Sequence, residues 1–147
     1  MIEAAIRSVV LGLPAVAALG ASMGPAPPPQ GVGTLGGPSL PVITFQRISN
    51  PSSMTLDGTP NPGRIRLQID CWAAGDDHDG ARALALAVKG GGQKSAKPGL
   101  NGFAGMVLGE RLRGVFLVDE RDFYESDVLL RRVSMDFIVH AEEGVAA

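Results

Sequence analysis

Two stretches of the chain alternate strictly between apolar and polar residues, and they constrain the fold more than any other feature. In residues 64–72 the apolar positions are Ile65, Leu67, Ile69 and Cys71, and in residues 128–140 they are Val133, Met135, Phe137 and Val139. Because successive side chains of a strand point to opposite faces, this period predicts two β-strands, each with one dry and one wet face. Such strands favour a mainly antiparallel sheet that is covered on one face.

Helical spacing marks two other parts of the sequence. At the N-terminus the apolar residues fall on one helical face and predict a helix, and Pro14 then suits the first turn of a second short helix, Pro14–Leu19, which Gly20 can end. Residues 77–89 predict a further helix that is N-capped by Asp76 or Asp77 and ended by Gly90 to Gly92. The apolar positions are Ile2, Ile6, Val9, Val10 and Leu13 in the first helix and Ala81, Leu84, Ala85 and Val88 in the last.

The remaining segments complete the expected order of elements. Residues 41–48 predict a strand, and residues 106–118 predict another that is broken or bent at Gly109 or Gly114. Long loops rich in Pro and Gly are expected at about 22–40, 50–63 and 93–105, with a frayed tail at 141–147. The expectation is a single domain, 1–147, of the α+β class: a mainly antiparallel four-stranded sheet in the order helix, strand, strand, helix, strand, strand, with the helices on one face.

Composition excludes several classes of protein. The chain has 147 residues, enough for one domain with a real core, and aromatic residues make up only 5%, so that core must be mainly aliphatic. A net charge of −2 argues against a domain that grips nucleic acid. The single cysteine, Cys71, excludes an internal disulfide and a multi-thiolate zinc site, and indicates a reducing compartment.

The N-terminal segment has one rival interpretation. Residues 8–24 are uncharged and follow Arg7, as in a secretory signal, but Glu3 and Pro14 weaken that pattern and favour the helices. A membrane span is favoured even less, because spanning needs about 20 apolar residues without such breaks.

Two glycine-rich motifs suggest nucleotide binding but lack its context. Gly31, Gly33 and Gly36 spell G-x-G-x-x-G, with Asp57 at the distance of a ribose-binding acid, yet the motif needs a strand before it and a helix after it. Here PAPPP precedes it and a Gly-Pro pair follows, which indicates a flexible loop. Residues 90–95 resemble a P-loop only faintly, because they end a helix instead of opening one.

Two further motifs suggest catalysis or metal binding. Gly20-x-Ser22-x-Gly24 has the letters of a nucleophile elbow but lies between a helix and a loop, whereas the elbow needs a strand and then a helix. The acids of 76–79, with His78 and His140, suggest a metal site, but consecutive residues do not converge on one ion and helix capping already explains the acids. No catalytic, cofactor-binding or metal-binding residue is therefore assigned.

The polar face of the 64–72 strand carries a large aromatic residue. Trp72 shares the parity of its polar residues, so the only tryptophan is expected to point away from the core. Either Trp72 anchors a partner on this face, or a loop of the same chain covers it.

In order along the chain, five segments resemble the tail-completion, or tail-terminator, proteins of long-tailed phages: IRSVVLGLPAVAALG, PAPPPQG to LPVITFQ, RIRLQIDCWA, DGARALALAV and VLLRRVSMDFIVH. The resemblance implies a small non-enzymatic α+β subunit, made in the host cytoplasm, that forms a ring, typically of six, at the head-proximal end of the tail tube. It implies that the ring stops tube polymerisation, binds the tube protein and the head connector, and leaves a channel through which DNA passes, without contact to a membrane.

Within that resemblance, we expect the contact residues to lie on the polar sheet face and in the first hairpin's loop. They are Arg64, Arg66, Asp70, Trp72, Arg132 and Asp136 on the face and Met54, Leu56 and Asp57 in the loop, which would reach an adjacent ring. A head-side connector or stopper ring, or a tail tube subunit, shares this type of scaffold and remains open. More distant alternatives are a small serine hydrolase using Ser22 and a secreted binding module.

Overall fold

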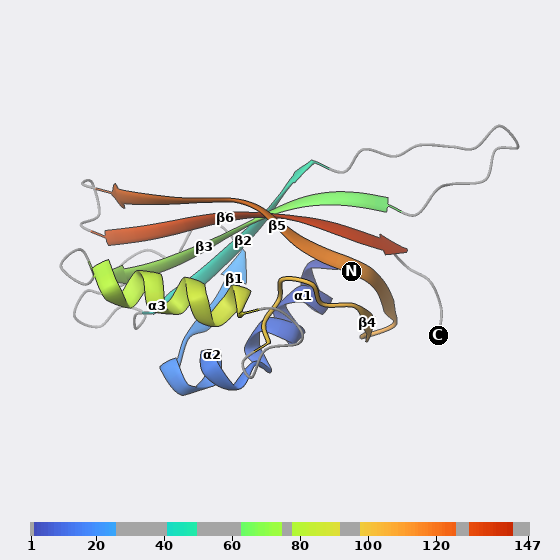
Figure 1. The fold of residues 1–147 in the computed structure, drawn as a ribbon, viewed down its shortest axis with the longest axis horizontal. Coiled ribbons are helices and arrows are strands. Elements are labelled where there is room, and N and C mark those ends of the chain that lie inside the picture. Colours follow the sequence, from blue (N-terminus) through green and yellow to red (C-terminus); the bar gives the residue numbers. More distant parts are fainter. Residues whose placement is uncertain are drawn as a thin grey trace, which may run out of the picture.

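A computed structural model describes residues 2–25, 41–49, 63–74, 78–91, 98–125 and 130–142. Its elements are α1 (Ile2–Leu11), α2 (Pro14–Leu19), β1 (Ser22–Pro25), β2 (Val42–Ser49), β3 (Gly63–Ala74), α3 (His78–Lys89), β4 (Gly105–Val107), β5 (Glu110–Glu125) and β6 (Leu130–Glu142). The six strands form one mixed sheet in the order β1-β2-β3-β6-β5-β4, antiparallel except where β1 runs parallel to β2. The sheet is strongly curled and the three helices lie on one side of it (Figure 1), which confirms the α+β class.

The expectation of four strands is wrong, because two segments without a clear strand pattern also pair in the sheet. Ser22–Pro25, expected to open a loop, is the edge strand β1, which buries Met23 against the core. The expected strand at 106–118 is a hairpin of β4 and β5 that turns at Leu108 and Gly109, and β6 continues into the expected tail through Glu142.

The strand β5 extends to Glu125 through the charged run DERDFYE, which no apolar alternation marks. This part of β5 is supported by α3 instead of by apolar packing. Lys89 Nζ lies 2.8 Å from Glu120 Oε2, and Arg82 Nη1 lies 2.8 Å from Asp122 Oδ2. Ion pairs therefore join strand to helix at a place where the core ends.

The two N-terminal helices form as expected and dock on the sheet. Pro14 stands at the start of α2, and Gly20 ends it in the left-handed conformation with φ of 68°. Arg7 Nε donates a hydrogen bond to the carbonyl of Met23 at 3.0 Å, which ties α1 to β1. Of the helices in the described part of the chain, none is long and apolar enough to cross a membrane.

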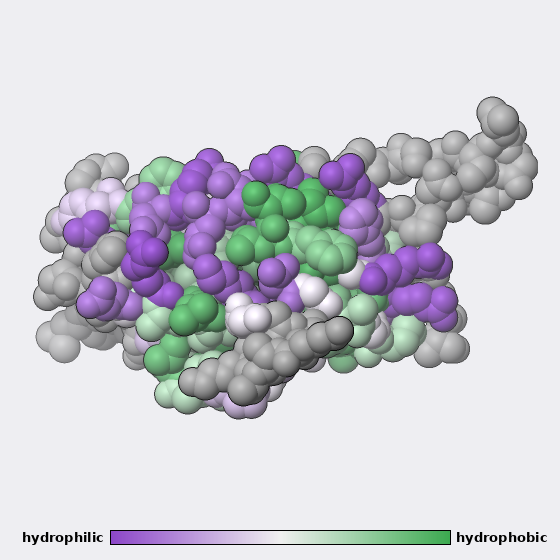
Figure 2. Space-filling model, in the orientation of Figure 1, coloured by the Kyte–Doolittle hydropathy of each residue, from purple (hydrophilic) through white to green (hydrophobic). Residues whose placement is uncertain are grey.

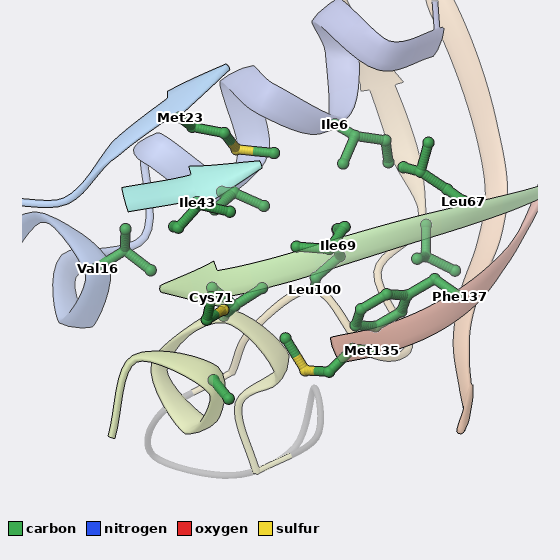
Figure 3. Close-up of a cluster of buried hydrophobic side chains, with 14 of the residues drawn as sticks. Ile6, Val16, Met23, Ile43, Leu67, Ile69, Cys71, Leu100, Met135 and Phe137 are labelled. Atoms are coloured by element: carbon green, nitrogen blue, oxygen red, sulfur yellow. The ribbon is translucent and has the colours of Figure 1, made fainter. Parts of the chain in front are cut away.

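The core lies between the inner face of the sheet and the helices (Figure 3), and it is mainly aliphatic as the composition predicts. The predicted inward positions of β3 and β6 are all buried, and so is the expected stripe of α3. Phe137 is the largest of the fully buried side chains. The strands contribute Ile65, Leu67, Ile69, Cys71, Val133, Met135, Phe137 and Val139, and the helices contribute Ile2, Ile6, Val10, Val16, Ala81, Leu84, Ala85 and Val88.

The C-terminal end of α3 is closed by a backbone crossing. Gly90 has φ of 71° and its N–H bonds the carbonyl of Leu86 at 2.8 Å, so the glycine ends the helix as expected. The chain then returns across this end, where the N–H groups of Leu100 and Asn101 donate to the carbonyls of Val88 and Lys89 at 2.8 and 3.2 Å. These bonds satisfy carbonyls that a helix end otherwise leaves without partners.

Candidate functional site

The face of the sheet that turns away from the helices, called here the outer face, carries the candidate site. No described helix covers it (Figure 1). Strand alternation and register place the following residues on it: Thr44 of β2, Arg64, Arg66, Gln68, Asp70 and Trp72 of β3, Arg132, Ser134, Asp136, Ile138 and His140 of β6, and Phe116, Asp119, Arg121 and Phe123 of β5.

Trp72 points away from the main core, as its parity predicts, but its ring is not an open anchor. It is only 7% exposed and forms a small second cluster with Val42 and Leu130. Its Nε1–H donates a hydrogen bond to Thr44 Oγ1 at 2.9 Å, which satisfies the one polar atom of the indole. Residues of the neighbouring strands β2 and β6 therefore cover much of the Trp72 ring.

Arg132 links the tryptophan to the rest of the outer face. Its guanidinium carbon lies 5.5 Å from the centroid of the Trp72 ring and 4.6 Å from that of Phe123, distances at which cation–π attraction is favourable. Its Nη1 lies 3.4 Å from Asp70 Oδ2. The arginine is thus held between two rings and a carboxylate, in a fixed orientation.

Two buried carboxylates, Asp70 and Asp136, bind polar and charged side chains on the outer face. Gln68 Nε2 donates to both carboxylate oxygens of Asp70 at 3.1 Å. Asp136 Oδ2 lies 2.7 Å from Arg66 Nη2 and 3.5 Å from Arg121 Nη2. The hydrogen bond and charge of Asp136 raise the pKa of Arg66 above its usual value, so this guanidinium stays protonated. The side chains of Arg66 and Arg121 remain 44% and 48% exposed, whereas that of Asp136 is 5% exposed.

The outer face is therefore less exposed to solvent than its polar sequence predicts. Thr44, Asp70, Ser134 and Asp136 are all buried, although the polar face of β3 and β6, which carries the last three, is expected from the sequence to face water. The short side chains are shielded because long arginine stems lie beside them and keep their charged heads at the surface. Ser134 Oγ and Asp136 Oδ1 are buried without a hydrogen-bond partner, so the network is not closed within the described chain.

Six of the expected contact residues share this face: Arg64, Arg66, Asp70, Trp72, Arg132 and Asp136. Arg64 is exposed, opposite His140 in the register of β3 and β6. The other three, Met54, Leu56 and Asp57, lie outside the described residues. Sequence reasoning missed Asp119, Arg121 and Phe123 because it ended the strand at Val118, although these three share one parity.

The motifs that suggested catalysis are not assembled by the described residues. Ser22 lies on β1, and His140 lies on β6, three strands away and eight residues along the strand from Arg132, which is in register with Ser22; strand spacing alone separates them by about 14 Å. Within the described ranges no group of His, Cys, Asp and Glu side chains could hold a metal ion. The glycine motif at 31–36 lies outside the described residues.

Cys71 is fully buried in the core, where burial and the nearby charges of Asp70 and Glu120 raise the pKa of its thiol well above the usual value. A buried neutral thiol is a poor nucleophile, because the thiolate is the reactive form. Cys71 therefore acts as a small apolar core residue.

The fold and the outer face together define a small α+β protein whose uncovered sheet face carries an ordered network of charged side chains. The family model of the tail completion protein gp17 matches residues 4–142. The chain belongs to this family, and it is a virion tail component of phage-like particles. This confirms the resemblance that the sequence segments carry.

A solved structure shares the fold. A chain in a structure titled "Virion of native gene transfer agent (GTA) particle" is 20% identical, with a TM-score of 0.68, over 95% of this chain and 93% of that one. No curated protein matches the chain in sequence.

Proposed function

We propose that copies of this chain form a ring, of six subunits, at the head-proximal end of the tail tube, where the ring ends tube polymerisation and joins the tail to the head connector. Membership of a tail completion family supports a structural, non-enzymatic role in finishing the tail. The outer face is the observation that supports a contact between subunits. No described helix covers it, and it exposes half of Phe116 and the charged ends of Arg66 and Arg121.

The outer face suits a contact between unlike surfaces. Its arginines are held in place by buried carboxylates, so few side-chain rotations are lost when a partner binds. Aromatic and arginine side chains are the groups that most often anchor protein interfaces. A head-to-tail contact of this kind closes into a ring when the rotation between neighbours allows it.

The proposed ring has two further partners, the tube protein on one side and the head connector or stopper protein on the other. Met54, Leu56 and Asp57 are proposed to reach the adjacent ring from their loop. DNA passes through the channel without being held, since the chain carries a net charge of −2 and Asp70, Asp119 and Asp136 balance arginines on the outer face. The subunit is made in the host cytoplasm and ends in the neck region of the virion.

The first test of this proposal measures the oligomer formed by the purified chain, by light scattering and by negative-stain electron microscopy. Arg64→Glu reverses a charge on the outer face, and among the described residues no ion pair of Arg64 would be broken by this change. We expect the concentration at half-assembly to rise about tenfold, while the stability of the subunit changes by less than about 0.5 kcal/mol.

Arg82→Glu is the charge-reversal control, because Arg82 is exposed on α3, on the helical side of the sheet, and its ion pair with Asp122 is itself exposed, so breaking it should cost the subunit no more than about 1 kcal/mol. This variant should assemble like the unchanged chain. Equal assembly of the Arg64 and Arg82 variants would remove Arg64 from the contact, and an unchanged chain that stays single at every concentration would contradict the self-assembling ring.

A further inference from the structure

Asp136, on the outer face of β6, holds arginines from both neighbouring strands. Its Oδ2 atom lies 2.7 Å from Nη2 of Arg66 on β3 and 3.5 Å from Nη2 of Arg121 on β5. The sheet order places β6 between these two strands, so the two guanidinium groups meet around one carboxylate oxygen. Without a negative charge between them, two guanidinium groups at this separation would repel each other.

The two arginines reach Asp136 from diagonal positions of the strand register. The residues directly opposite Asp136 are Gln68 on β3 and Asp119 on β5. The Gln68 amide donates to Asp70 instead, and Asp119 is itself an acid. Among the described residues, Asp136 Oδ1 has no hydrogen-bond partner, and the two arginines are the groups that hold this carboxylate.

The stability of the subunit does not explain a carboxylate in this environment. The side chain of Asp136 is almost fully buried, and a buried carboxylate oxygen without a partner costs free energy. Replacing a buried ionic group by apolar residues is often neutral or stabilising. The presence of Asp136 is therefore explained by its effect on the two arginines, whose charged ends it fixes at the surface.

The fixed guanidinium groups have N–H groups to spare. A guanidinium carries five N–H donors and no acceptor. Among the described residues, Arg66 bonds Asp136 through one Nη, and Arg121 contacts the carboxylates of Asp136 and Asp119. Nearly half of each arginine side chain is exposed, so donors remain that acceptor groups of another protein can reach.

Exposed apolar residues lie next to this pair. Ile138 lies between Arg66 and Phe116 in the register of the three strands, and Phe116 is half exposed. Val118, also on β5, is half exposed as well. Figure 2 shows a hydrophobic patch over the middle of β5, bordered by hydrophilic residues. Apolar surface beside oriented arginines is the composition typical of the centre of a protein interface.

We propose that Asp136 is a positioning residue of the contact between subunits: it sets Arg66 and Arg121 as one pair of donors, and this pair donates to acceptor groups of a neighbouring copy of this chain. Asp136 is buried and does not touch the neighbour itself. The inference rests on the proposed function, and it names the groups through which the outer face binds.

The positioning is tested on the dilute, unassembled chain by nitrogen-15 relaxation of the arginine Nε–H groups. Asp136→Asn should stay folded, because Asn has the same shape and the guanidinium groups left behind are exposed to water. The order parameter of Arg66 should fall below about 0.6 in this variant, and that of Arg121 should fall less, because Asp119 also holds it. Arg132, which two aromatic rings hold, is the internal control. Unchanged order parameters would overturn the positioning role.

The use of the pair is tested by assembly. Asp136→Asn should raise the concentration at half-assembly about tenfold. In a chain that already carries Arg66→Gln, the same change should raise it less than about threefold further, because one of the groups through which Asp136 acts is gone. Glu120→Gln is the matched control, since it removes a carboxylate that holds Lys89 at 2.8 Å on the helical side of the sheet, and it should leave assembly unchanged.

The outcomes separate this role from the ring itself. Assembly of Asp136→Asn at the unchanged concentration, or an equal effect of this change with and without Arg66, would overturn the role of the pair and leave the ring in place. An unchanged chain that never self-associates would overturn both the ring and this role.

Discussion

Replacing Trp72 with Ala is expected to lower the free energy of unfolding by about 3 to 5 kcal/mol, the usual cost of removing a large buried aromatic side chain. Trp72 is 7% exposed, packs with Val42 and Leu130, and satisfies Thr44 through its indole N–H. The change also removes one of the two rings that hold Arg132. Urea unfolding of the dilute, unassembled chain, followed by circular dichroism, measures the effect.

Two controls separate the packing of the Trp72 side chain from its hydrogen bond to Thr44 and its contact with Arg132. Trp72→Phe keeps most of the apolar volume and loses the hydrogen bond, so it should cost about 1 to 2 kcal/mol. Phe123→Ala removes the other ring beside Arg132, but Phe123 is 38% exposed and should cost less than the Trp72→Ala change. A loss below 1 kcal/mol for Trp72→Ala would show that the second cluster is not packed as described.

Replacing Gly99 with Ala is expected to destabilise the subunit by about 2 to 3 kcal/mol. A Cβ at this position would lie 2.5 Å from the nitrogen of Gly90 and 2.6 Å from the carbonyl oxygen of Lys89. These are backbone atoms at the end of α3, so the crossing would have to open and the hydrogen bonds from Leu100 and Asn101 would weaken. Thermal unfolding should show the loss as a lower melting temperature.

Gly24→Ala is the matched control for Gly99→Ala. A Cβ at Gly24 meets no atom within 4 Å, and this glycine does not have a positive φ. Its change should therefore alter stability by less than about 0.5 kcal/mol. Equal stability of the two variants would mean that the crossing over α3 is not close.

The sequence predicted the elements whose apolar pattern is regular. The alternation in β3 and β6 and the helical stripe of α3 each correspond to buried residues, because one face of each element packs on the core. The same reasoning missed β1 and the second half of β5. Four residues of β1 are too few to show a period, and β5 beyond Val118 is held by ion pairs such as Lys89 with Glu120 instead of by a core.

The candidate site was predictable in position but not in character. Parity placed Asp70, Trp72 and Asp136 on the face opposite the core, which the structure confirms. Their burial was not predictable, because it depends on which arginines of neighbouring strands lie over them, and sequence spacing does not give strand order. The positive φ of Leu108 in the β4–β5 turn could be found only from the backbone, since residues other than glycine seldom adopt it.

Electron microscopy of particles assembled without this chain tests the central claim most directly. The measured quantities are the length of each tail and whether it is joined to a filled head. If the chain caps the tube, tails should be overlong or uneven and separated from filled heads. Tails of normal length would contradict the cap, and would point instead to a role on the head side of the joint.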